Sequence, residues 1–167
     1  MKGSLVNDTA IDSTFTFFTC IMFSKATEYA LRAVIYIAQQ SQYEHKPGIP
    51  EIAKAIGSPR HFTAKILQQL TRDQRIIQSV RGPGGGFFMI EKAGNLPVKV
   101  ILQAMDEDYI LEKCVLGLRK CSEKTPCPMH HKFKLIRQQL LQLFDEKTIQ
   151  QLADETKKGK SPAMLKL

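Results

Sequence analysis

Three cysteines and two histidines lie close together in the second half of this chain. Cys114, Cys121 and Cys127 fall within 14 residues and are followed by His130 and His131, which gives the pattern C-x6-C-x5-C-x2-H. Three of the chain's four cysteines therefore occupy one short segment, a concentration that chance placement rarely produces. Thiolate sulfur and imidazole nitrogen are both good ligands for transition metals, so this segment is where the sequence concentrates its chemistry.

Several kinds of chemistry use such a cluster. Structural disulfides would leave one of the three cysteines unpaired. A structural zinc site usually takes its cysteines as C-x2-4-C pairs, which these wider gaps do not provide. A nucleophilic cysteine with a histidine base is chemically feasible, but no further catalytic signature accompanies it. An iron–sulfur cluster tolerates irregular spacing and accepts His in place of Cys, so the spacing leaves a cluster, a zinc site and a redox-active thiol open.

The most regular part of the sequence, residues 49–90, predicts a winged helix-turn-helix. Pro50 suits the first turn of a helix, and Gly57 ends that helix after one short apolar face. Ser58 followed by Pro59 predicts the N-cap and first residue of a second helix, so the turn between the two helices has only a few residues. Such a tight turn is typical of a helix-turn-helix.

The second helix is predicted to have an apolar and a polar side. Apolar residues recur at the helical period, which turns the polar side outward. The apolar side holds Phe62, Ile66, Leu67 and Leu70. The candidate DNA-reading residues are Arg60, His61, Ala64, Lys65 and Gln68, with Ser58 at the start of the helix. A polar face is also typical of a merely solvated helix, so the segment that follows decides between the two interpretations.

A hairpin follows the second helix. Residues 76–80 and 87–90 predict two short strands, joined by the run Arg81-Gly-Pro-Gly-Gly-Gly86. The run is not a nucleotide-binding P-loop, because it lacks the Lys-Ser/Thr pair, Pro83 removes a backbone donor, and a strand follows instead of a helix. A hairpin after a reading helix indicates a wing. Its candidate DNA contacts are Arg81, Gly82, Gly84 and Gly85.

The charge of the chain favours a polyanionic partner. The formal net charge is +8, and the isoelectric point is about 9.4. Residues 58–81 carry five Arg or Lys against one Asp, a local excess of +4 that suits a phosphate backbone. No segment approaches the roughly 20 apolar residues of a membrane span. We therefore expect double-stranded DNA as the partner, no membrane contact, and a cytoplasmic location.

The sequence as a whole predicts a mainly α-helical protein with a small β-hairpin. We expect the natural start at Met22, a supporting helix from Ser24 and a short helix at 96–105; the loop at 41–48 receives no chemical role. The predicted divisions are a disordered or non-native extension at 1–21, the winged helix-turn-helix domain at 22–105, a cysteine-containing sensor loop at 106–130, dimerisation helices at 131–156 and a basic tail at 157–167.

A long helix predicted at 131–146 carries an apolar stripe that must be buried against something. The stripe holds Phe133, Ile136, Leu140 and Leu143. It can pack on its own domain, but a helix that follows a long loop is better placed to pair with the same helix of a second copy. A two-fold homodimer would bind a pseudo-palindromic DNA site.

Two strings in the chain resemble a known family. IPEIAKAIGSPRHFTAKILQQL followed by SVRGPGGGF is similar to the Rrf2 family of bacterial winged helix-turn-helix transcription regulators, and the resemblance extends over roughly residues 22–154. It implies a dimeric repressor or activator rather than an enzyme. It also implies that the second helix enters the major groove and that Arg81 reaches the minor groove.

The resemblance implies a cofactor as well. Many Rrf2 regulators hold a [2Fe-2S] or [4Fe-4S] cluster on three cysteines spaced near C-x5-7-C-x5-C, which Cys114, Cys121 and Cys127 match. In the iron–sulfur assembly regulators of the family the fourth ligand is a His at the position of His130. In nitric-oxide-sensing members it is an acidic residue of the partner's first helix, at the position of Glu28. The expected function is a DNA-binding regulator controlled by an iron–sulfur cluster, with a thiol-redox-switched or cluster-free regulator as the alternative.

Overall fold

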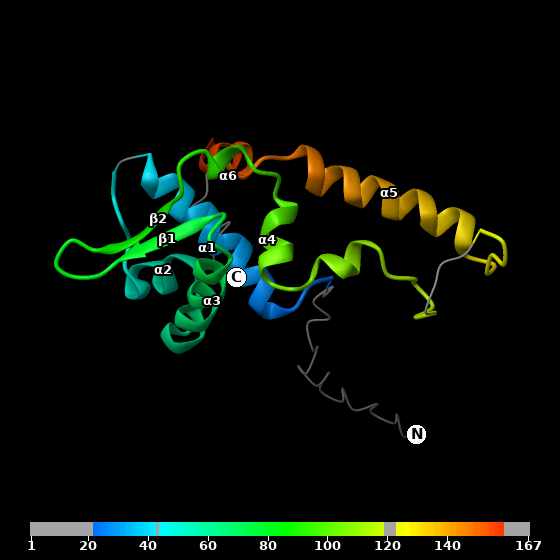
Figure 1. Ribbon diagram of the computed structural model, residues 1–167, viewed down its shortest axis with the longest axis horizontal. Helices are drawn as coiled ribbons and strands as arrows, with labels where there is room; N and C mark the ends of the chain where they lie inside the picture. The colour runs from blue at the N-terminus through cyan, green and yellow to red at the C-terminus, as the bar shows by residue number, and fades with distance from the viewer. Residues whose placement is uncertain (1–21, 43, 119–122, 159–167) are drawn as a thin grey trace, which may run out of the picture.

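The computed structural model describes residues 22–42, 44–118 and 123–158 (Figure 1). The predictions for residues 1–21, for Cys121 and for the tail from residue 159 onward lie outside the described residues. Within these ranges the chain is mainly α-helical with one two-stranded hairpin, as the sequence predicts. None of the described helices is long and apolar enough to cross a membrane.

Helix α1 (Lys25–Ser41) is the element against which most of the others pack. The Ser24 hydroxyl caps it by accepting a hydrogen bond from the backbone N–H of Thr27 at 3.2 Å, which confirms the predicted start. Ala30, Ala33 and Ala38 are buried along the helix. Their small side chains leave room for neighbouring elements on several sides.

The helix-turn-helix consists of α2 (Ile49–Ile56) and α3 (Arg60–Asp73). Gly57 ends α2 in the left-handed conformation, with φ at 67° and its N–H donating to the carbonyl of Ala53, as the sequence predicts. The predicted N-cap of the second helix is wrong, because Pro59 rather than Ser58 holds that position. Pro59 has an extended ψ of 138°, and its carbonyl accepts the first helical hydrogen bond at 2.9 Å, from the N–H of Thr63.

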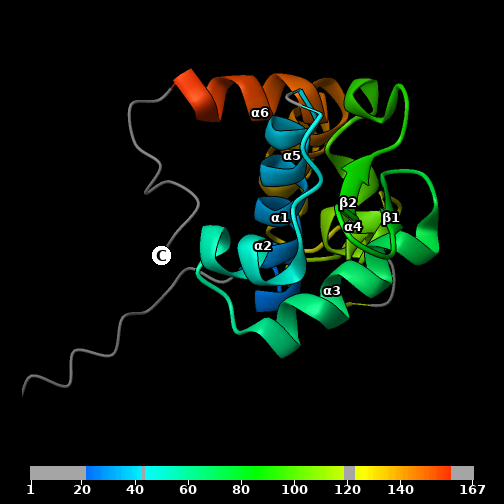
Figure 2. The ribbon, with the colours of Figure 1, turned by 90° about the vertical axis from the view of Figure 1, so that its left-hand side faces the viewer.

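The predicted wing is an antiparallel hairpin of β1 (Ile77–Val80) and β2 (Gly86–Met89). Ile77 pairs with Met89 at the base and Val80 pairs with Gly86 near the tip. Ile77 is buried in the core while Val80 is exposed, so the hairpin is rooted at one end and extends into solvent at the other. Figure 1 shows α2, α3 and the hairpin together on the side of the molecule away from the helix at His130–Glu146, and Figure 2 turns that side toward the viewer.

Helix α4 (Lys99–Ala104) is shorter than the helix predicted at 96–105. Residues before Lys99 bond to a distant segment instead of starting the helix: Pro97 forms a β-bridge with Thr148, and the Val98 N–H donates to the carbonyl of Lys147 at 2.9 Å. Short 3₁₀ turns, η1 (Ala93–Asn95) and η2 (Asp108–Leu111), flank α4 on either side.

Helix α5 (His130–Glu146) projects away from the body (Figure 1). Its C-terminal part is anchored, because Leu140 and Phe144 pack against a small cluster of Phe23, Leu102 and Leu111. The rings of Phe23 and Phe144 meet edge to face, with centroids 5.5 Å apart. The N-terminal part of α5 lies beyond this anchor, above the segment that follows η2.

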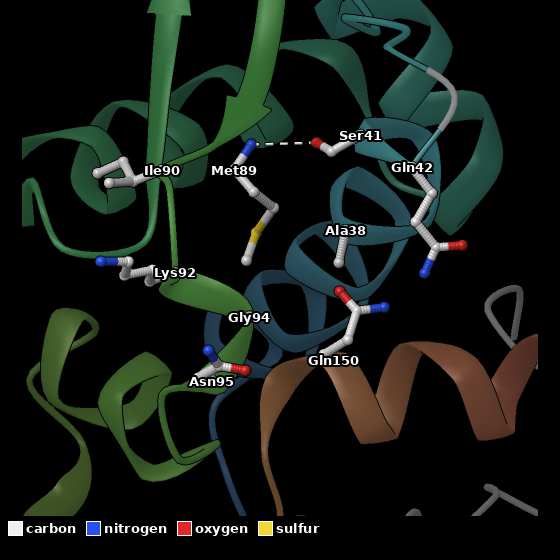
Figure 3. Close-up of a pocket in the computed structure, with 9 residues that line it drawn as sticks. All are labelled: Ala38, Ser41, Gln42, Met89, Ile90, Lys92, Gly94, Asn95 and Gln150. Atoms are coloured by element: carbon white, nitrogen blue, oxygen red, sulfur yellow. Dashed lines mark hydrogen bonds between the residues drawn. The ribbon is translucent and has the colours of Figure 1, made fainter.

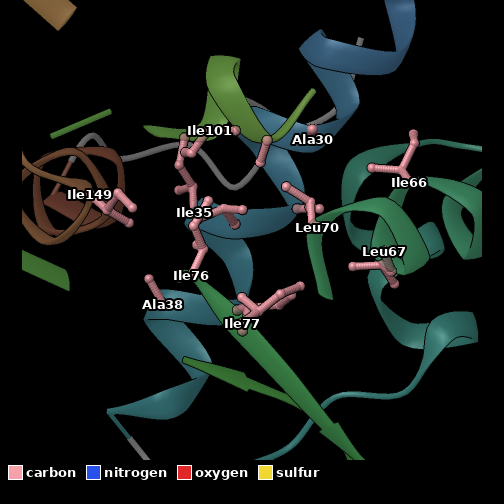
Figure 4. Close-up of a cluster of buried hydrophobic side chains, with 14 of the residues drawn as sticks. Ala30, Ile35, Ala38, Ile66, Leu67, Leu70, Ile76, Ile77, Ile101 and Ile149 are labelled. Atoms are coloured by element: carbon pink, nitrogen blue, oxygen red, sulfur yellow. The ribbon is translucent and has the colours of Figure 1, made fainter. Parts of the chain in front are cut away.

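Helix α6 (Ile149–Lys158) returns to the body and packs along α1. Ile149 and Ala153 are fully buried there, and the side-chain amide of Gln39 donates to the Ala153 carbonyl at 3.0 Å. The sequence groups this helix with α5 and ends it at 156, but it extends to Lys158 and contributes to the core around α1. Side chains from α1, α3, α4, α6 and the start of the hairpin meet in that core (Figure 4).

Candidate nucleic-acid interface and cysteine segment

Helix α3 has the two sides that the sequence predicts. Ile66, Leu67 and Leu70 are buried, and Phe62 is half-buried. Thr63 is also fully buried, which the sequence pattern did not indicate; its hydroxyl donates to the Pro59 carbonyl at 3.1 Å and is therefore satisfied. The outward side holds Arg60, His61, Lys65 and Gln68, all exposed, with Ala64 and the preceding Ser58 half-buried.

Three cations on α3 and at the wing tip have no acidic partner among the described residues. Within the ranges that the structure describes, no acidic side chain forms an ion pair with Arg60, Lys65 or Arg81. Asp73, the one acid of this region, is engaged with Arg75 at the far end of α3. The helix and the wing therefore present uncompensated positive charge to solvent, which attracts a polyanion.

The tip of the wing requires its glycines. Gly82 and Gly84 have φ values of 102° and 73°, which L side chains rarely adopt. A Cβ on Gly85 would lie 2.3 Å from the carbonyl oxygen of Val80, so that position is closed to any larger residue. Arg81, Gly82 and Gly84 are exposed at this tip.

The loop before α2, to which the sequence assigned no role, packs against the wing. The Phe87 N–H donates to the Pro47 carbonyl at 3.0 Å, and the ammonium of Lys46 lies 5.3 Å from the centre of the Phe88 ring. A Cβ on Gly86 would lie 2.1 Å from the carbonyl oxygen of Lys46. The available signal was Gly86 itself, since a glycine inside a strand often marks the close approach of another backbone.

Glu51 connects this loop to the helices. The Tyr36 hydroxyl on α1 donates to Glu51 Oε1 at 2.8 Å, and His45 Nε2 lies 2.9 Å from the same oxygen. Burial raises the pKa of Tyr36 to about 12, and the hydrogen bond and negative charge of Glu51 act in the same direction. Tyr36 therefore stays a neutral donor to Glu51 over the physiological pH range.

The C-terminal end of α3 is tied to α4. The Gln69 side chain donates to the Ala104 carbonyl at 3.2 Å, and Arg75 Nη1 donates to Gln103 Oε1 at 3.0 Å. The same guanidinium holds Asp73 through two hydrogen bonds of 2.7 and 2.8 Å. The recognition helix candidate is thus bonded to the helix that leads into the cysteine segment.

Two of the three clustered cysteines and their histidine lie within the described residues. Cys114 is buried, Cys127 is half-buried, and the buried His130 begins α5 with its N–H donating to the Cys127 carbonyl at 2.9 Å. His131 is exposed, so the structure separates the environments of the two histidines. Among the described residues, which exclude Cys121, no three His, Cys, Asp or Glu side chains are gathered as a metal site.

Glu28, the alternative fourth ligand, lies in the first turn of α1. Its carboxylate pairs with Lys25 at 2.8 Å and with Arg32 at 3.4 Å, and its side chain is only 20% exposed. Within one chain this carboxylate therefore already has two cationic partners.

The cysteine segment is fastened to α5 on both sides of the undescribed residues 119–122. Arg137 Nη1 donates to the Glu112 carbonyl at 3.0 Å, and Glu123 forms an ion pair with Lys134. The Lys134 ammonium holds the pKa of the Glu123 carboxyl below its usual range. The N-terminal end of the segment, which begins at residue 106, contacts the start of α1. There the Ser24 N–H donates to Glu107 Oε2 at 3.0 Å.

A pocket of about 290 Å³ lies elsewhere, between the end of α1, the base of the wing and α6 (Figure 3). Met89 points into it, and its N–H donates to the Ser41 hydroxyl at 3.1 Å. None of the predicted DNA-contact or metal-ligand residues lines this pocket. The candidate functional residues are instead on α3, the wing tip and the cysteine segment.

The sequence profile of the Rrf2 family, described as an iron-dependent transcriptional regulator, matches residues 23–155 of this chain. The chain belongs to the Rrf2 family. An HTH-type transcriptional regulator of Aquifex aeolicus is 33% identical over 144 residues, which cover 85% of this chain and 98% of the relative. The IscR regulator of Pectobacterium atrosepticum is 25% identical over 126 residues, 75% of each chain.

Solved structures share the fold at lower identity. CymR, the global cysteine regulator of B. subtilis, aligns with a TM-score of 0.64 at 17% identity, covering 80% of this chain and 96% of CymR. IscR of T. potens aligns with a TM-score of 0.62 at 16% identity, covering 83% and 90%. The predicted family and fold class are confirmed: this Rrf2 protein is a transcriptional regulator and not an enzyme.

The Asp73–Arg75 pair predicts how the stability of this Rrf2 regulator depends on pH. Hydrogen bonds from Arg75 lower the pKa of Asp73, against a smaller opposing effect of burial. A carboxyl with a lowered folded-state pKa stabilises the protein above its unfolded pKa, near 4, and that contribution is lost as the pH falls through the folded-state value. Asp73→Asn should therefore have a lower free energy of unfolding than wild type at pH 7. The difference in free energy between the two proteins should narrow on acidification below about pH 4.

Urea unfolding at fixed protein concentration, followed by circular dichroism between pH 2 and 7, measures this difference. Asp106→Asn removes a carboxylate that belongs to none of the described ion pairs, so it serves as the control and should show less narrowing. A gap between Asp73→Asn and wild type that stays constant over the whole range would contradict the assignment.

Proposed function

We propose that this Rrf2 protein regulates transcription as a homodimer that places α3 in the major groove and the wing tip at the minor groove. The observation that carries the proposal is the uncompensated cation set on α3 and the wing, on one side of the body. Arg60, His61, Lys65 and Gln68 offer donors that reach base edges or phosphates, and Ala64 leaves room for close approach. Ser58, Gly82, Gly84 and Gly85 would contact the backbone, and Arg81 would enter the minor groove.

An exposed apolar stripe that runs along α5 from the residue before it supports a homodimer. Met129, Ile136 and Leu143 follow one another at seven-residue spacing and are 48%, 58% and 60% exposed. Leu140 and Phe144 lie beside this stripe on the helix and pack on their own chain, so part of the predicted stripe is covered, whereas these three side chains stay exposed within the part of the chain that the structure describes. A second copy of the helix would bury it, and the two-fold symmetry of such a pair suits a pseudo-palindromic DNA site.

The cysteine segment has the donor set of an iron–sulfur site. Two thiols and an imidazole, from Cys114, Cys127 and His130, belong to one short segment fastened along α5, and Cys121 supplies a third thiol in the sequence between them. Burial of Cys114 and His130 would shield ligand bonds from water. When bound, a [2Fe-2S] or [4Fe-4S] cluster would link these side chains covalently and make that link sensitive to oxidants. The relatives named IscR favour this assignment.

The chain's own bonds suggest how the state of the segment would reach the DNA-binding side. One end of the segment follows α4, which is hydrogen-bonded to α3 through Gln69 and Arg75. Its other end starts α5, the proposed dimer helix. Ordering the segment would fix α5 relative to α3, and hence the spacing and tilt of the two recognition helices in the dimer.

A thiol switch is the alternative function. Cys127 is half-buried and therefore reachable by a small oxidant, and the structural neighbours include CymR, a global cysteine regulator. In that case peroxide would convert the cysteines to a sulfenate or disulfide, and the protein would be colourless.

The homodimer is tested by charging the exposed stripe. The double variant Ile136→Glu/Leu143→Glu should be monomeric, because carboxylates are costly to bury in an apolar interface. Light scattering after size exclusion should give a mass near 18.9 kDa for this variant and twice that for wild type. Gln138→Glu places the same charge at an exposed position outside the stripe and should remain dimeric. A dimeric double variant would rule out α5 pairing.

DNA docking is tested through the salt dependence of binding. For a duplex selected by the wild-type protein from a random pool, Lys65→Gln and Arg81→Gln should each bind about tenfold more weakly. The slope of log K against log salt should fall by about 0.9 for each lost phosphate contact. Lys92→Gln removes an exposed cation outside α3 and the wing, and serves as the control. Unchanged slopes for both test variants would count against this docking.

The cofactor is tested by absorption spectroscopy with iron and sulfide analysis of protein purified without oxygen. We expect a brown protein with charge-transfer bands above about 300 nm, lost in Cys121→Ala and Cys114→Ala. Cys20→Ala, outside the cluster, should keep the bands. His130→Ala and Glu28→Gln identify the fourth ligand by which of them alters the spectrum, with the exposed His131 as a control for His130. A colourless protein without iron, even after anaerobic reconstitution, would leave the thiol switch.

A further inference from the structure

The contacts between the two strands of the wing are too few to fix its orientation relative to the body. A two-stranded hairpin of four residues per strand is only marginally stable in water, and its tip extends into solvent with Val80 exposed. The position of Arg81 relative to α3 must therefore be fixed by whatever holds the base of the hairpin. Ile77 anchors β1 in the core, so the question concerns β2.

Two neighbours hold β2. Near the end of the strand, the Ser41 hydroxyl at the end of α1 accepts from the Met89 N–H at 3.1 Å. At the start of the strand and along the same edge, loop 44–48 binds β2, with the Pro47 carbonyl accepting from the Phe87 N–H at 3.0 Å. The carbonyl of Lys46 reaches so close to Gly86 that a Cβ there would lie 2.1 Å from its oxygen. Only glycine permits this approach.

Loop 44–48 is itself fixed to the helix-turn-helix. His45 Nε2 lies within 2.9 Å of Glu51 in the first turn of α2, and Glu51 also accepts from Tyr36 of α1. The ammonium of Lys46 lies over the Phe88 ring, which adds a third contact between the loop and β2. The wing and the reading helices are thereby connected through backbone and side-chain contacts of one short loop.

We propose that loop 44–48, seated against Gly86, is the positioning element that sets the distance and angle of Arg81 relative to α3. Gly86 touches no DNA in this arrangement and acts through Arg81. The inference rests on the proposed DNA docking, because the position of the wing has a consequence only if the wing contacts DNA.

A double-mutant cycle tests it with the duplex selected by the wild-type protein. Gly86→Ala should push the loop off the strand, move the wing and weaken binding about tenfold, as much as Arg81→Ala does. In the Arg81→Ala background Gly86→Ala should add less than a twofold loss, because a positioning residue has nothing left to position. Gly48→Ala is the matched control, since its Cβ would meet only Pro50 Cδ, at 3.6 Å, and it should bind like wild type.

Thermal unfolding of each variant, run beside the binding measurements, checks that the fold is kept. If Gly86→Ala does not fold, Phe88→Leu serves as the second variant, because it removes the ring beneath Lys46. It should weaken DNA binding two- to threefold in the wild-type background and leave binding unchanged in the Arg81→Ala background. Equal losses in both backgrounds, or wild-type affinity for a folded Gly86→Ala, would overturn the positioning role. A wild-type protein that selects no duplex would overturn the proposed function itself, which is a different result.

Discussion

Burial of α1 on several sides constrains the arrangement of everything else in the molecule. Helices α2, α3, α4 and α6 and strand β2 all contact it, and its inner positions are alanine or β-branched residues. A close-packed helix of this kind leaves little room for one neighbour to move without disturbing another. The recognition helix candidate, the wing base and the returning α6 are therefore held to one reference element, and changes in DNA affinity have to come from elements outside this packing.

Helix α5 is such an element, because only part of it is covered. Phe144 and Leu140 attach its C-terminal half to the body, while Ile136 and Met129 remain exposed farther out. A small rotation at the attached end is amplified along the helix, which rises about 1.5 Å per residue. The cysteine segment lies along the same free half and is bonded to it at Arg137. The chain thus places its partly uncovered helix and its clustered cysteines side by side.

The parts that could be predicted from the sequence depend on local rules, and the parts that could not depend on contacts distant in the chain. Gly57 and Pro50 bound α2, and the period of Ile66, Leu67 and Leu70 orients α3, because both effects act within a few residues. The packing of Pro47 on Phe87 joins segments about 40 residues apart and left only one trace, a glycine in a strand. The return of α6 onto α1 and the bond from Arg75 to Gln103 left none. For the candidate site, spacing identified the cysteines and His130, but not that His130 is buried and His131 exposed.

These distant contacts define how a signal in the cysteine segment could alter DNA affinity under the proposed function. In the proposed dimer each subunit has one DNA-binding head, which consists of its α3 and its wing. Loop 44–48 and Glu51 join these two elements, so each head behaves as one unit. A change in the segment then leaves the contacts of a single head intact and alters only how two heads are related through α5. Binding to two half-sites depends steeply on that relation, since a head that cannot reach its half-site contributes no affinity. Regulation of this kind needs no change in any base-contacting residue, which is why Cys114 and Cys127 can lie in a segment separate from α3.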